Sequence, residues 1–539
     1  MKLWMKLLLS AVLISLTSTA GLEKLAVQDG GRVKPYDTLS KELLQLVHGK
    51  KTYNSMPATE VVFTWLIHPS GWQKTKFIEI SYKELKTQLG FPVEEKYFSP
   101  EEILSAPKFA SLMQELEAKR GKGNKLGPFE QSLQRLENQI IVLREMAAGR
   151  LLKIVPSTES KTWISVDVLP AEYIPLFQDI TASFVKLVGA KAQSQDTKEW
   201  QSQLDTAVEK FENKVLQTFP ESGIHPEKIQ AEVHYNQFHP FQWAWIFYLI
   251  TMLVFAMAWL WKDALAKIGW FTGFAGLFFH IYGFGLRVYL MGRAPVTNMY
   301  ETVIWAAFGV IFFAMVIEAI YKWRFVLMMG GLVAGLCLIL SDMAPAVLDG
   351  SLQPLEAVLR NNFWLLIHVL TITISYAAFL LAFALGNMGL VLVWRGEEKY
   401  KSKIQQVNMA IYRCIQIGVS FLAPGIILGG VWADYSWGRF WGWDPKETWA
   451  LIVLLGYMAV LHARLAGWLK QFGMMMSAVL SFALVIMAWY GVNFVLGAGK
   501  HSYGFGAGGV EYVTGFLVAQ FLFTIYVVMI RSRRQKLKV

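Results

Sequence analysis

Residues 432–449 read WADYSWGRFWGWDPKETW, and this stretch decides how the rest of the chain is interpreted. Its five tryptophans are Trp432, Trp437, Trp441, Trp443 and Trp449. Long apolar runs on both sides predict a loop between two membrane spans. A loop that meets water rarely carries so much aromatic surface, so we expect a large, flat, apolar ligand with an anionic edge. A porphyrin fits, because rings can stack on its faces and cations can pair with its propionates.

The composition divides the chain into two parts. Hydrophobic residues make up 54% and charged residues only 17% of the 539 residues, whereas soluble domains carry about 25% charged residues. Most of the charge lies in residues 21–240, and residues 241–530 are nearly continuous apolar sequence. We therefore predict an all-α polytopic membrane protein with a mainly helical N-terminal extracytoplasmic domain.

The net charge of +11 does not indicate nucleic-acid binding. The positive residues gather in short loops between apolar runs and in the tail at 531–539, RSRRQKLKV, as in membrane proteins that mark their cytoplasmic side. The two cysteines, Cys337 and Cys414, lie inside apolar runs and form no CxxC motif. A dithiol oxidoreductase and a disulfide-stapled fold are both excluded.

Residues 1–20 resemble a targeting segment. Lys2 and Lys6 precede the apolar run LLLSAVLISL, and small residues follow at 18–20. This pattern predicts a secretory signal peptide, with an uncleaved N-terminal anchor as the alternative. Either one places residue 21 onward outside the cytoplasm.

The N-terminal domain shows helical periodicity in four segments: 37–48, 100–118, 128–148 and 197–217. Residues 77–81, FIEIS, alternate like a strand. The domain shows no catalytic constellation in its sequence. Its histidines are scattered, and we expect each to be solvated or satisfied within the fold: His48, His68, His225, His234 and His239.

About nine spans are predicted in the membrane part, at 241–261, 266–290, 301–320, 325–341, 363–394, 408–431, 449–467, 473–496 and 511–530. An odd number of spans after an external domain puts the C-terminus inside. The loops predicted to be cytoplasmic carry more Lys and Arg than the external ones, which agrees with this orientation. The tryptophan loop is then external.

Two histidines are predicted to lie at the depth of the tryptophan loop. His368 is near the external end of the fifth span, and His501 lies in the glycine-rich external loop GAGKHSYGFGAGG. Two neutral imidazoles, one on each face of a porphyrin, are what a six-coordinate haem iron needs. Alternatively they are interfacial histidines bonded to backbone, with the tryptophans as membrane anchors.

Two further histidines lie within spans. His462, in LHARLAGW, falls towards the cytoplasmic side of the seventh span, and an ionisable residue there is a functional candidate. His280, in FFHIYGFGLR, lies in the middle of the second span. The sequence leaves open whether His280 is a ligand or a packed core histidine.

These residues resemble the System II cytochrome c synthases of the CcsA/ResC family. The resemblance rests on WGRFWGWDPKETWALI at 437–452, on HARLAGW at 462–468 and on HSYGFGAGG at 501–509, with GRAPVTNMYET at 292–302 as a further match. It covers roughly residues 240–530. Residues 24–50 more weakly resemble the external region of proteins in which the two System II subunits are fused.

The resemblance implies a haem-handling site. His368 and His501 would be axial ligands to external haem b, and His462 would belong to an inner haem site completed by a CcsB/ResB-like subunit. His280 could take the place of that subunit's ligand, but no family motif assigns it this role. Haem b is then both substrate and bound ligand. The expected cofactor-binding residues in the loop are Trp432, Trp437, Trp441, Trp443, Asp444, Arg439 and Lys446, where Arg439 and Lys446 are candidates for propionate contacts or for loop charge pairing.

The implied reaction is covalent attachment of haem to the CxxCH segment of apocytochrome c, by addition of two thiols to two vinyl groups. The implied partners are the CcsB/ResB-like subunit, apocytochrome c and a thiol-reducing protein, and the implied location is the bacterial inner membrane with the tryptophan loop on the periplasmic side. Two alternatives remain: a haem chaperone that hands haem on, and an unrelated transporter whose tryptophans are interface anchors.

Overall fold

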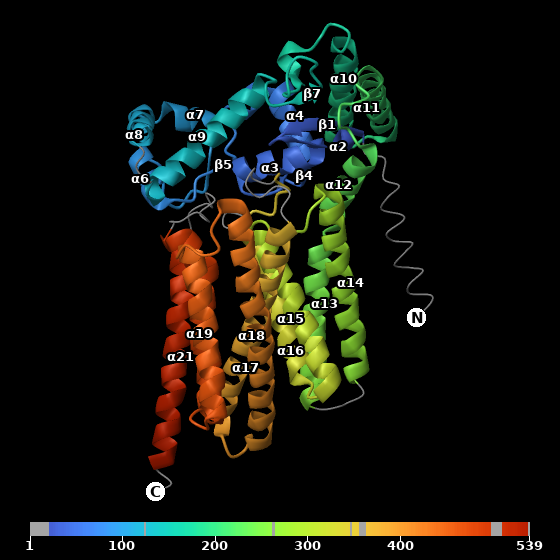
Figure 1. Ribbon diagram of the computed structural model, residues 1–539. Coiled ribbons are helices and arrows are strands. Elements are labelled where there is room, and N and C mark those ends of the chain that lie inside the picture. Colours follow the sequence, from blue (N-terminus) through green and yellow to red (C-terminus); the bar gives the residue numbers. More distant parts are fainter. Residues whose placement is uncertain are drawn as a thin grey trace. The chain divides into compact units, whose positions relative to one another are not determined.

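A computed structural model describes residues 21–122, 126–260, 265–344, 348–354, 363–496 and 509–536. The chain divides into two compact units, Met1–Phe238 and His239–Val539. The elements are labelled in Figure 1.

Unit 1 is mainly helical. Its helices are α2 (Gly21–Lys24), α3 (Tyr36–His48), α4 (Ala58–Ile67), α5 (Pro69–Trp72), α6 (Lys83–Leu89), α7 (Pro100–Ser105), α8 (Phe109–Gly121), α9 (Pro128–Ala147), α10 (Ile174–Ala192), α11 (Lys198–Thr218) and α12 (Pro226–Phe238), with a short 3-10 helix η1 (Val166–Val168). Four antiparallel strand pairs join them: β1 (Ala26–Asp29) with β2 (Arg32–Pro35), β3 (Thr52–Tyr53) with β4 (Met56–Pro57), β5 (Ile78–Glu79) with β6 (Tyr97–Phe98), and β7 (Lys153–Val155) with β8 (Ile164–Ser165).

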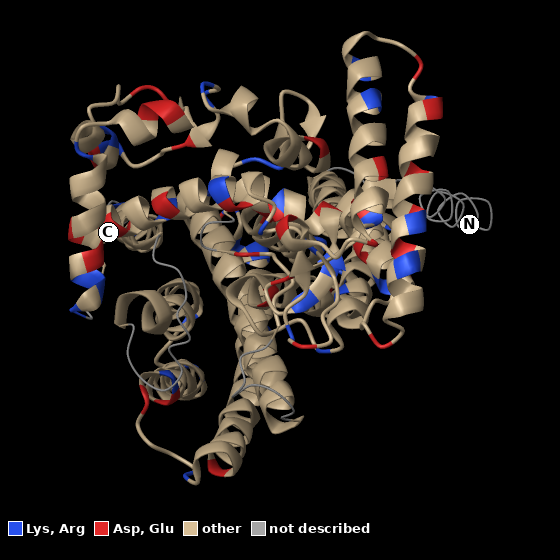
Figure 2. Ribbon diagram, turned by 90° about the horizontal axis from the view of Figure 1, so that it is seen from above, with Lys and Arg blue, Asp and Glu red and all other residues tan. Residues whose placement is uncertain are grey.

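The sequence predicted the helices of unit 1 only in part. The segment predicted as one helix at 100–118 is two helices, because Pro107 disfavours the helical conformation at Ala106, whose ψ is 124°. The strand predicted at 77–81 pairs only through Ile78 and Glu79. Helices α4, α10 and α12 were not predicted. Charged side chains are spread over the helices of this unit, which is typical of a water-exposed domain (Figure 2).

The hairpin β1–β2 is tied to α12 by buried polar contacts. Nη1 and Nη2 of Arg32 each donate to Glu232 at 2.7 Å, and the Thr38 hydroxyl donates to the same carboxylate at 2.7 Å. Because Glu232 is only 3% exposed, this fork-shaped pair is worth more than a surface ion pair. The segment that resembles the external region of fused proteins is thereby fixed to the last helix of unit 1.

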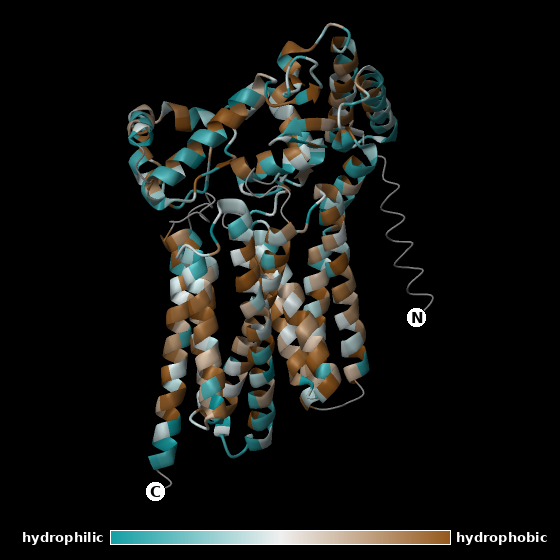
Figure 3. Cartoon of the chain, in the orientation of Figure 1, coloured by the Kyte–Doolittle hydropathy of each residue, from teal (hydrophilic) through white to brown (hydrophobic). Residues whose placement is uncertain are grey.

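Unit 2 is a bundle of long apolar helices. They are α13 (Pro240–Leu260), α14 (Leu265–Met291), α15 (Met299–Tyr321), α16 (Phe325–Met343), α17 (Phe363–Gly396), α18 (Lys401–Trp437), α19 (Pro445–Leu465), α20 (Gln471–Ile486), which continues into the π-helix η3 (Met487–Leu496), and α21 (Val510–Lys536). Within the described residues, nine helices are long and apolar enough to cross a membrane, as their hydropathy in Figure 3 illustrates. The predicted polytopic membrane protein is confirmed.

Successive spans run in opposite directions, so their connections gather at two ends of the bundle (Figure 1). Residues 292–298, 348–354 and 438–444 lie at one end, which we call the tryptophan end. Residues 322–324, 397–400 and 466–470 lie at the other end, which we call the basic end because it carries Lys322, Arg324, Lys399 and Lys470.

Glycines on α18 bring it close to α17. A β-carbon on Gly418 would lie 2.3 Å from the Phe379 ring, one on Gly425 would lie 2.7 Å from Ile372, and one on Gly429 would lie 2.5 Å from the His368 ring. The three glycines therefore face α17 and receive its side chains. Small residues allow such close approach between membrane helices.

Candidate functional site

The tryptophan stretch contains less loop than the sequence predicted. Helix α18 continues to Trp437 and α19 begins at Pro445, so only residues 438–444 are non-helical; we call these seven residues the tryptophan turn. The first helix ends at Gly438, which has a φ of 67° and donates its N–H to the Asp434 carbonyl. The second begins with Pro445 at its first position, after Asp444 as the N-cap.

Glu447 holds the tryptophan turn together. Its Oε2 accepts the backbone N–H groups of Gly442, at 2.8 Å, and Asp444, at 3.2 Å, and its Oε1 pairs with Nη1 of Arg439 at 3.1 Å. Asp444 in turn accepts the N–H of Lys446 at 3.0 Å, and Asp444 and Glu447 together form a capping box at the start of α19. One carboxylate thus connects three positions of the turn.

The tryptophans differ in exposure: Trp432 is buried, Trp443 is exposed, and Trp437, Trp441 and Trp449 are partly buried. Trp432 is 1% exposed and makes an edge contact with Trp437 at 4.7 Å, and the Arg439 guanidinium lies 5.5 Å from the Trp437 ring centre. Trp443 is 69% exposed and stands perpendicular to Trp441, with 5.8 Å between ring centres. Trp432 and Trp437 therefore support the turn, and Trp443 is available to a ligand.

Other aromatic side chains add to the exposed surface. Tyr435 is 73% exposed and stacks on Trp364 of α17 with 6.4 Å between centroids. Phe440 is 49% exposed and lies over Gly430, where a β-carbon would come within 2.5 Å of its ring. Trp364 and the glycine pair Gly429 and Gly430 were not predicted as part of the site. The adjacent glycines before an aromatic cluster were the available signal.

His368 lies beside this surface with a defined tautomer. Its Nδ1 is 2.7 Å from the Gly425 carbonyl oxygen, which can only accept, so Nδ1 carries the proton and the lone pair is on Nε2. The ring also packs against Gly429, next to the residue on which Phe440 rests. His368 of α17 and Phe440 of the tryptophan turn thus pack against adjacent glycines of α18, Gly429 and Gly430. An Nδ1–H bond to a backbone carbonyl is the arrangement that prepares imidazole for metal ligation.

His501 lies outside the described residues. It belongs to residues 497–508, which follow Leu496 of η3 in the chain. Its expected role stays a prediction from the sequence.

The two other histidines of the bundle differ sharply from each other. His462 is exposed, in the last turn of α19 at the basic end, and its Nδ1 donates to the Met458 carbonyl at 2.7 Å. His280 is fully buried, and both of its nitrogens are used: Nε2 donates to the Ile304 carbonyl at 3.1 Å, and Nδ1 accepts from the Tyr248 hydroxyl at 3.0 Å. His280 is therefore a satisfied core histidine, and the hypothesis that it is a ligand finds no geometric support.

The charged candidates have separate roles. Arg439 is paired with Glu447 and covers Gly442, where a β-carbon would lie 1.7 Å from its Nη1. Asp444 is 6% exposed and serves as the helix cap. The ammonium of Lys446 forms no salt bridge within the part of the chain that the structure describes, and the neighbouring Asp444 carboxylate acts on its charge. Lys446 remains a candidate for contact with an anionic ligand.

Protein side chains alone do not form a metal centre in the described ranges, where no group of three or more His, Cys, Asp or Glu could hold an ion. A single imidazole beside an aromatic surface suits an iron that arrives with its four porphyrin nitrogens. The exposed rings, the Lys446 ammonium and Nε2 of His368 fit a haem in chemical type.

Comparison with known proteins gives a consistent pattern. The family model described as "Cytochrome C assembly protein" matches residues 296–498. Protein NrfI of Wolinella succinogenes is 28% identical in an alignment 504 residues long, which covers 88% of this chain and 53% of that protein. Cytochrome c biogenesis protein CcsA of Guillardia theta is 33% identical over 246 residues, 41% of this chain and 80% of that protein. The CcsA of Chlamydomonas reinhardtii is 35% identical over 221 residues, 40% of this chain and 62% of that protein.

The coverage differs between the relatives. The chain spans about half the length of NrfI and less than two thirds of the Chlamydomonas protein. The matched residues 296–498 contain His368, the tryptophan turn and His462, and they exclude His280.

Proposed function

Because the chain belongs to the CcsA family of cytochrome c assembly proteins, we propose that it presents haem at the tryptophan end for covalent attachment to apocytochrome c. The observation that carries the proposal is the position of His368. Its Nδ1–H bond to Gly425 directs the Nε2 lone pair away from the backbone contact, and the ring packs beside the residue that supports Phe440. One side of a haem iron would be ligated there, and His501 is proposed for the other.

The tryptophan turn supplies the surface for the porphyrin. Tyr435, Phe440 and Trp443 are exposed aromatic rings, and a porphyrin face stacks on such rings. Lys446 would pair with a propionate. Arg439 would instead act mainly by fixing the turn, because its guanidinium is already paired with Glu447.

The proposed reaction adds two cysteine thiols of a CxxCH segment to the two haem vinyl groups. Each S–H adds across one C=C bond, so a C–S and a C–H bond form, no group leaves, and no net oxidation occurs. The nucleophiles come from the substrate. The contribution of this chain is to orient the haem and keep its iron ligated, which lowers the entropic part of the barrier.

A second haem contact is proposed at the basic end. His462 is exposed, and its Nδ1 donates to Met458, so the lone pair is on Nε2 here as well. We propose that a membrane subunit of the CcsB/ResB type supplies the opposite ligand. A thiol-reducing protein would keep the substrate cysteines reduced.

The proposed orientation places the tryptophan end outside and the basic end in the cytoplasm. The excess of Lys and Arg at the basic end and in the terminal part of α21 supports it, because cytoplasmic loops of membrane proteins are enriched in these residues. The bacterial inner membrane fits this arrangement.

The test is the absorption spectrum of the purified full-length protein. We expect the bands of low-spin, bis-histidine haem. His368→Ala should give the spectrum of five-coordinate haem, and added imidazole should partly restore the six-coordinate spectrum. The control variant His280→Gln should keep the wild-type spectrum in the fraction of the protein that folds. A wild-type preparation without haem, or an unchanged spectrum in His368→Ala, would refute the ligand assignment.

Attachment is tested separately from binding. The protein is co-expressed with a CcsB/ResB-type subunit and an apocytochrome c, and covalent haem is detected after denaturation. Haem binding without covalent product would favour a chaperone that hands haem on. Covalent product that depends on His368 supports the proposed synthase.

A further inference from the structure

One sequence motif has no role in the proposed site: GRAPVTNMYET, residues 292–302. It forms the connection between α14 and α15 and the first turn of α15. Its last residues make polar contacts to α14, to the connection at 348–354 and to η3. A segment that bonds to several neighbours at the end where haem is proposed to bind can determine their spacing.

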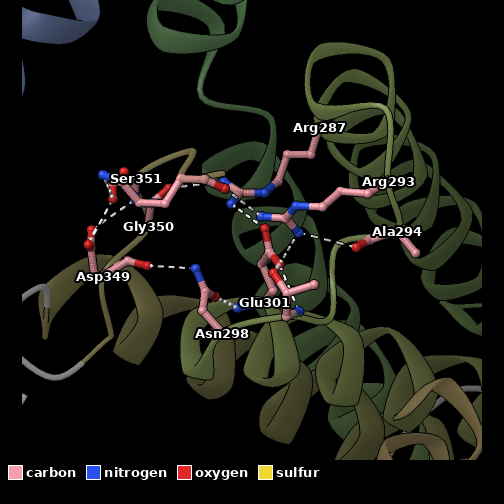
Figure 4. Close-up of polar contacts among 10 residues, drawn as sticks. Arg287, Arg293, Ala294, Asn298, Glu301, Asp349, Gly350 and Ser351 are labelled. Carbon is pink, nitrogen blue, oxygen red and sulfur yellow. Dashed lines mark hydrogen bonds and ion pairs between the residues drawn. The ribbon is translucent and has the colours of Figure 1, made fainter. Parts of the chain in front are cut away.

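Glu301 is the first contact point (Figure 4). Its carboxylate accepts hydrogen bonds from Nη2 of Arg287 at 2.8 Å and from Nη1 of Arg293 at 2.9 Å. It also accepts hydrogen bonds from the backbone N–H and the hydroxyl of Thr297, at 2.9 and 2.7 Å. Arg287 and Glu301 are each 1% exposed. A buried carboxylate with this many donors is held in one position, because moving it would leave buried charges without partners.

The same arginines reach the connection that leads from α16 to α17. Arg287 donates to the Gly350 carbonyl and Arg293 to the Gln353 carbonyl, each at 3.0 Å. Asn298, whose Oδ1 caps α15 through the Glu301 N–H, also faces this connection. The start of α15 is therefore bonded to residues shortly before α17, the helix that carries His368.

Trp305, one turn further along α15, contacts α17 itself. Its indole N–H donates to the Leu370 carbonyl at 3.3 Å, and Leu370 is two residues after His368. The Trp305 ring is held by stacking on Phe308 at 5.1 Å and by an edge contact with Phe284 at 5.6 Å. Trp305 thus bonds to the backbone of the turn that bears the proposed ligand.

Thr302 makes the contact to the π-helix. Its hydroxyl accepts the indole N–H of Trp489 at 3.0 Å and donates to the Met299 carbonyl at 2.8 Å. Asn493, one π-turn later, lies 3.4 Å from the Met299 sulfur. A ten-residue π-helix is rare and costly, and such segments occur mostly at functional sites, where neighbouring contacts maintain them.

We propose that the first two turns of α15 position the outer haem site, with Glu301, Thr302 and Trp305 as positioning residues. Together they connect the His368 turn of α17 to η3 through α15. The inference rests on the proposed function, since it assigns these residues a role towards haem at the tryptophan end. None of them has to touch the haem, because they act through α17 and η3.

The test breaks one hydrogen bond from both sides. Thr302→Val removes the acceptor, Trp489→Phe removes the donor, and the double variant removes both. Each single variant should weaken haem retention at the tryptophan end about fivefold, the usual effect of one lost hydrogen bond, and raise the high-spin fraction. The double variant should be no weaker than either single one, because all three lack the same bond.

Matched controls separate positioning from general damage. Thr302→Ser keeps the hydroxyl, so this variant should have the same haem retention and spectrum as the wild-type protein. Trp323→Phe removes an indole at the basic end, where Trp323 stacks on Tyr321 and Phe325, and should leave the low-spin bands unchanged. Trp305→Phe, which loses the bond to Leu370, should shift the spectrum in the same direction as Thr302→Val.

A readout without haem completes the test. Amide hydrogen exchange in residues 487–496 of the haem-free protein should become faster in Thr302→Val and stay normal in Thr302→Ser. Wild-type spectra and exchange in Thr302→Val, Trp489→Phe and Trp305→Phe would overturn the inference, as would independent, multiplying effects in the double variant. If the wild-type protein itself retained no haem, the proposed function would fail, whereas the exchange result would still report whether Thr302 fixes η3.

Discussion

Glu447 offers the sharpest test of how the tryptophan turn is built. Replacing it with glutamine keeps its size but removes the charge that Arg439 meets at 3.1 Å and weakens the two backbone bonds to Gly442 and Asp444. A helix cap contributes ~1 kcal/mol and a half-buried ion pair contributes up to ~1 kcal/mol. We therefore expect the free energy of local opening of the turn to fall by about 2 kcal/mol.

Hydrogen exchange in the full-length protein measures this change directly. A loss of about 2 kcal/mol corresponds to exchange roughly 30-fold faster at the amides of Gly442 and Asp444. Arg439→Gln should have a smaller effect, because the capping box with Asp444 stays intact. The matched control is Glu397→Gln, which breaks the 2.8 Å pair with Arg531 at the basic end and should leave the turn unchanged.

The outcome also bears on function. If the turn holds haem, Glu447→Gln should lower haem retention together with exchange protection, and Glu397→Gln should affect neither. Unchanged exchange at Gly442 and Asp444 in Glu447→Gln would show that the carboxylate does not organise the turn, and our account of this site would then be wrong.

Three further predictions follow from single residues. Gly429→Ala places a β-carbon 2.5 Å from the His368 ring and should shift the haem spectrum, whereas Gly418→Ala, which clashes with Phe379 instead, should lower thermal stability without that shift; equal spectra for the two variants would contradict the packing argument. His280→Ala leaves the Tyr248 hydroxyl and the Ile304 carbonyl without their partner and should cost about 2–4 kcal/mol of stability with a normal spectrum in the folded fraction, measured by thermal unfolding and absorption. Burial raises the pKa of Glu212 from 4.5 to about 7. Between these two pH values the Glu212 carboxyl is therefore protonated in folded unit 1 but ionised in the unfolded chain. Its contribution to stability is therefore fully present below pH 4.5 and is lost as the pH rises through 7, by an amount on the order of 3 kcal/mol, and Glu212→Gln should remove this dependence in urea unfolding of unit 1 monitored by exchange.

The spans were predictable from sequence because the membrane interior requires long apolar helices. Their ends were less predictable. Helix α18 runs to Trp437, well past the predicted end at 431, because residues such as Trp432 and Tyr435 lower the average hydropathy without interrupting the backbone hydrogen bonds. The actual stop signals were local ones, Gly438 and the Asp444–Pro445 pair.

The candidate site was predictable as a set of residue types but not as a set of contacts. Hydropathy and spacing indicated His368 and the tryptophans, yet could not show that Trp432 is buried and Trp443 exposed, because that depends on how two helices meet. Glu301 is a similar case, since its partners Arg287 and Arg293 belong to a different helix and a connection. The π-helix at 487–496 has no local sequence signature, and its contact with Thr302 links residues far apart in the chain.

His368 and His462 have the same tautomer for different reasons, and the difference has consequences. Both donate Nδ1–H to a backbone carbonyl at 2.7 Å, but the acceptor of His462 is Met458 on its own helix, whereas the acceptor of His368 is Gly425 on a neighbouring helix. The orientation of His462 is therefore set locally and should survive changes elsewhere in the bundle. The orientation of His368 depends on the close approach of α17 and α18 through Gly425 and Gly429. Any change that separates these helices should therefore alter the haem ligation proposed for the tryptophan end and leave His462 at the basic end unaffected.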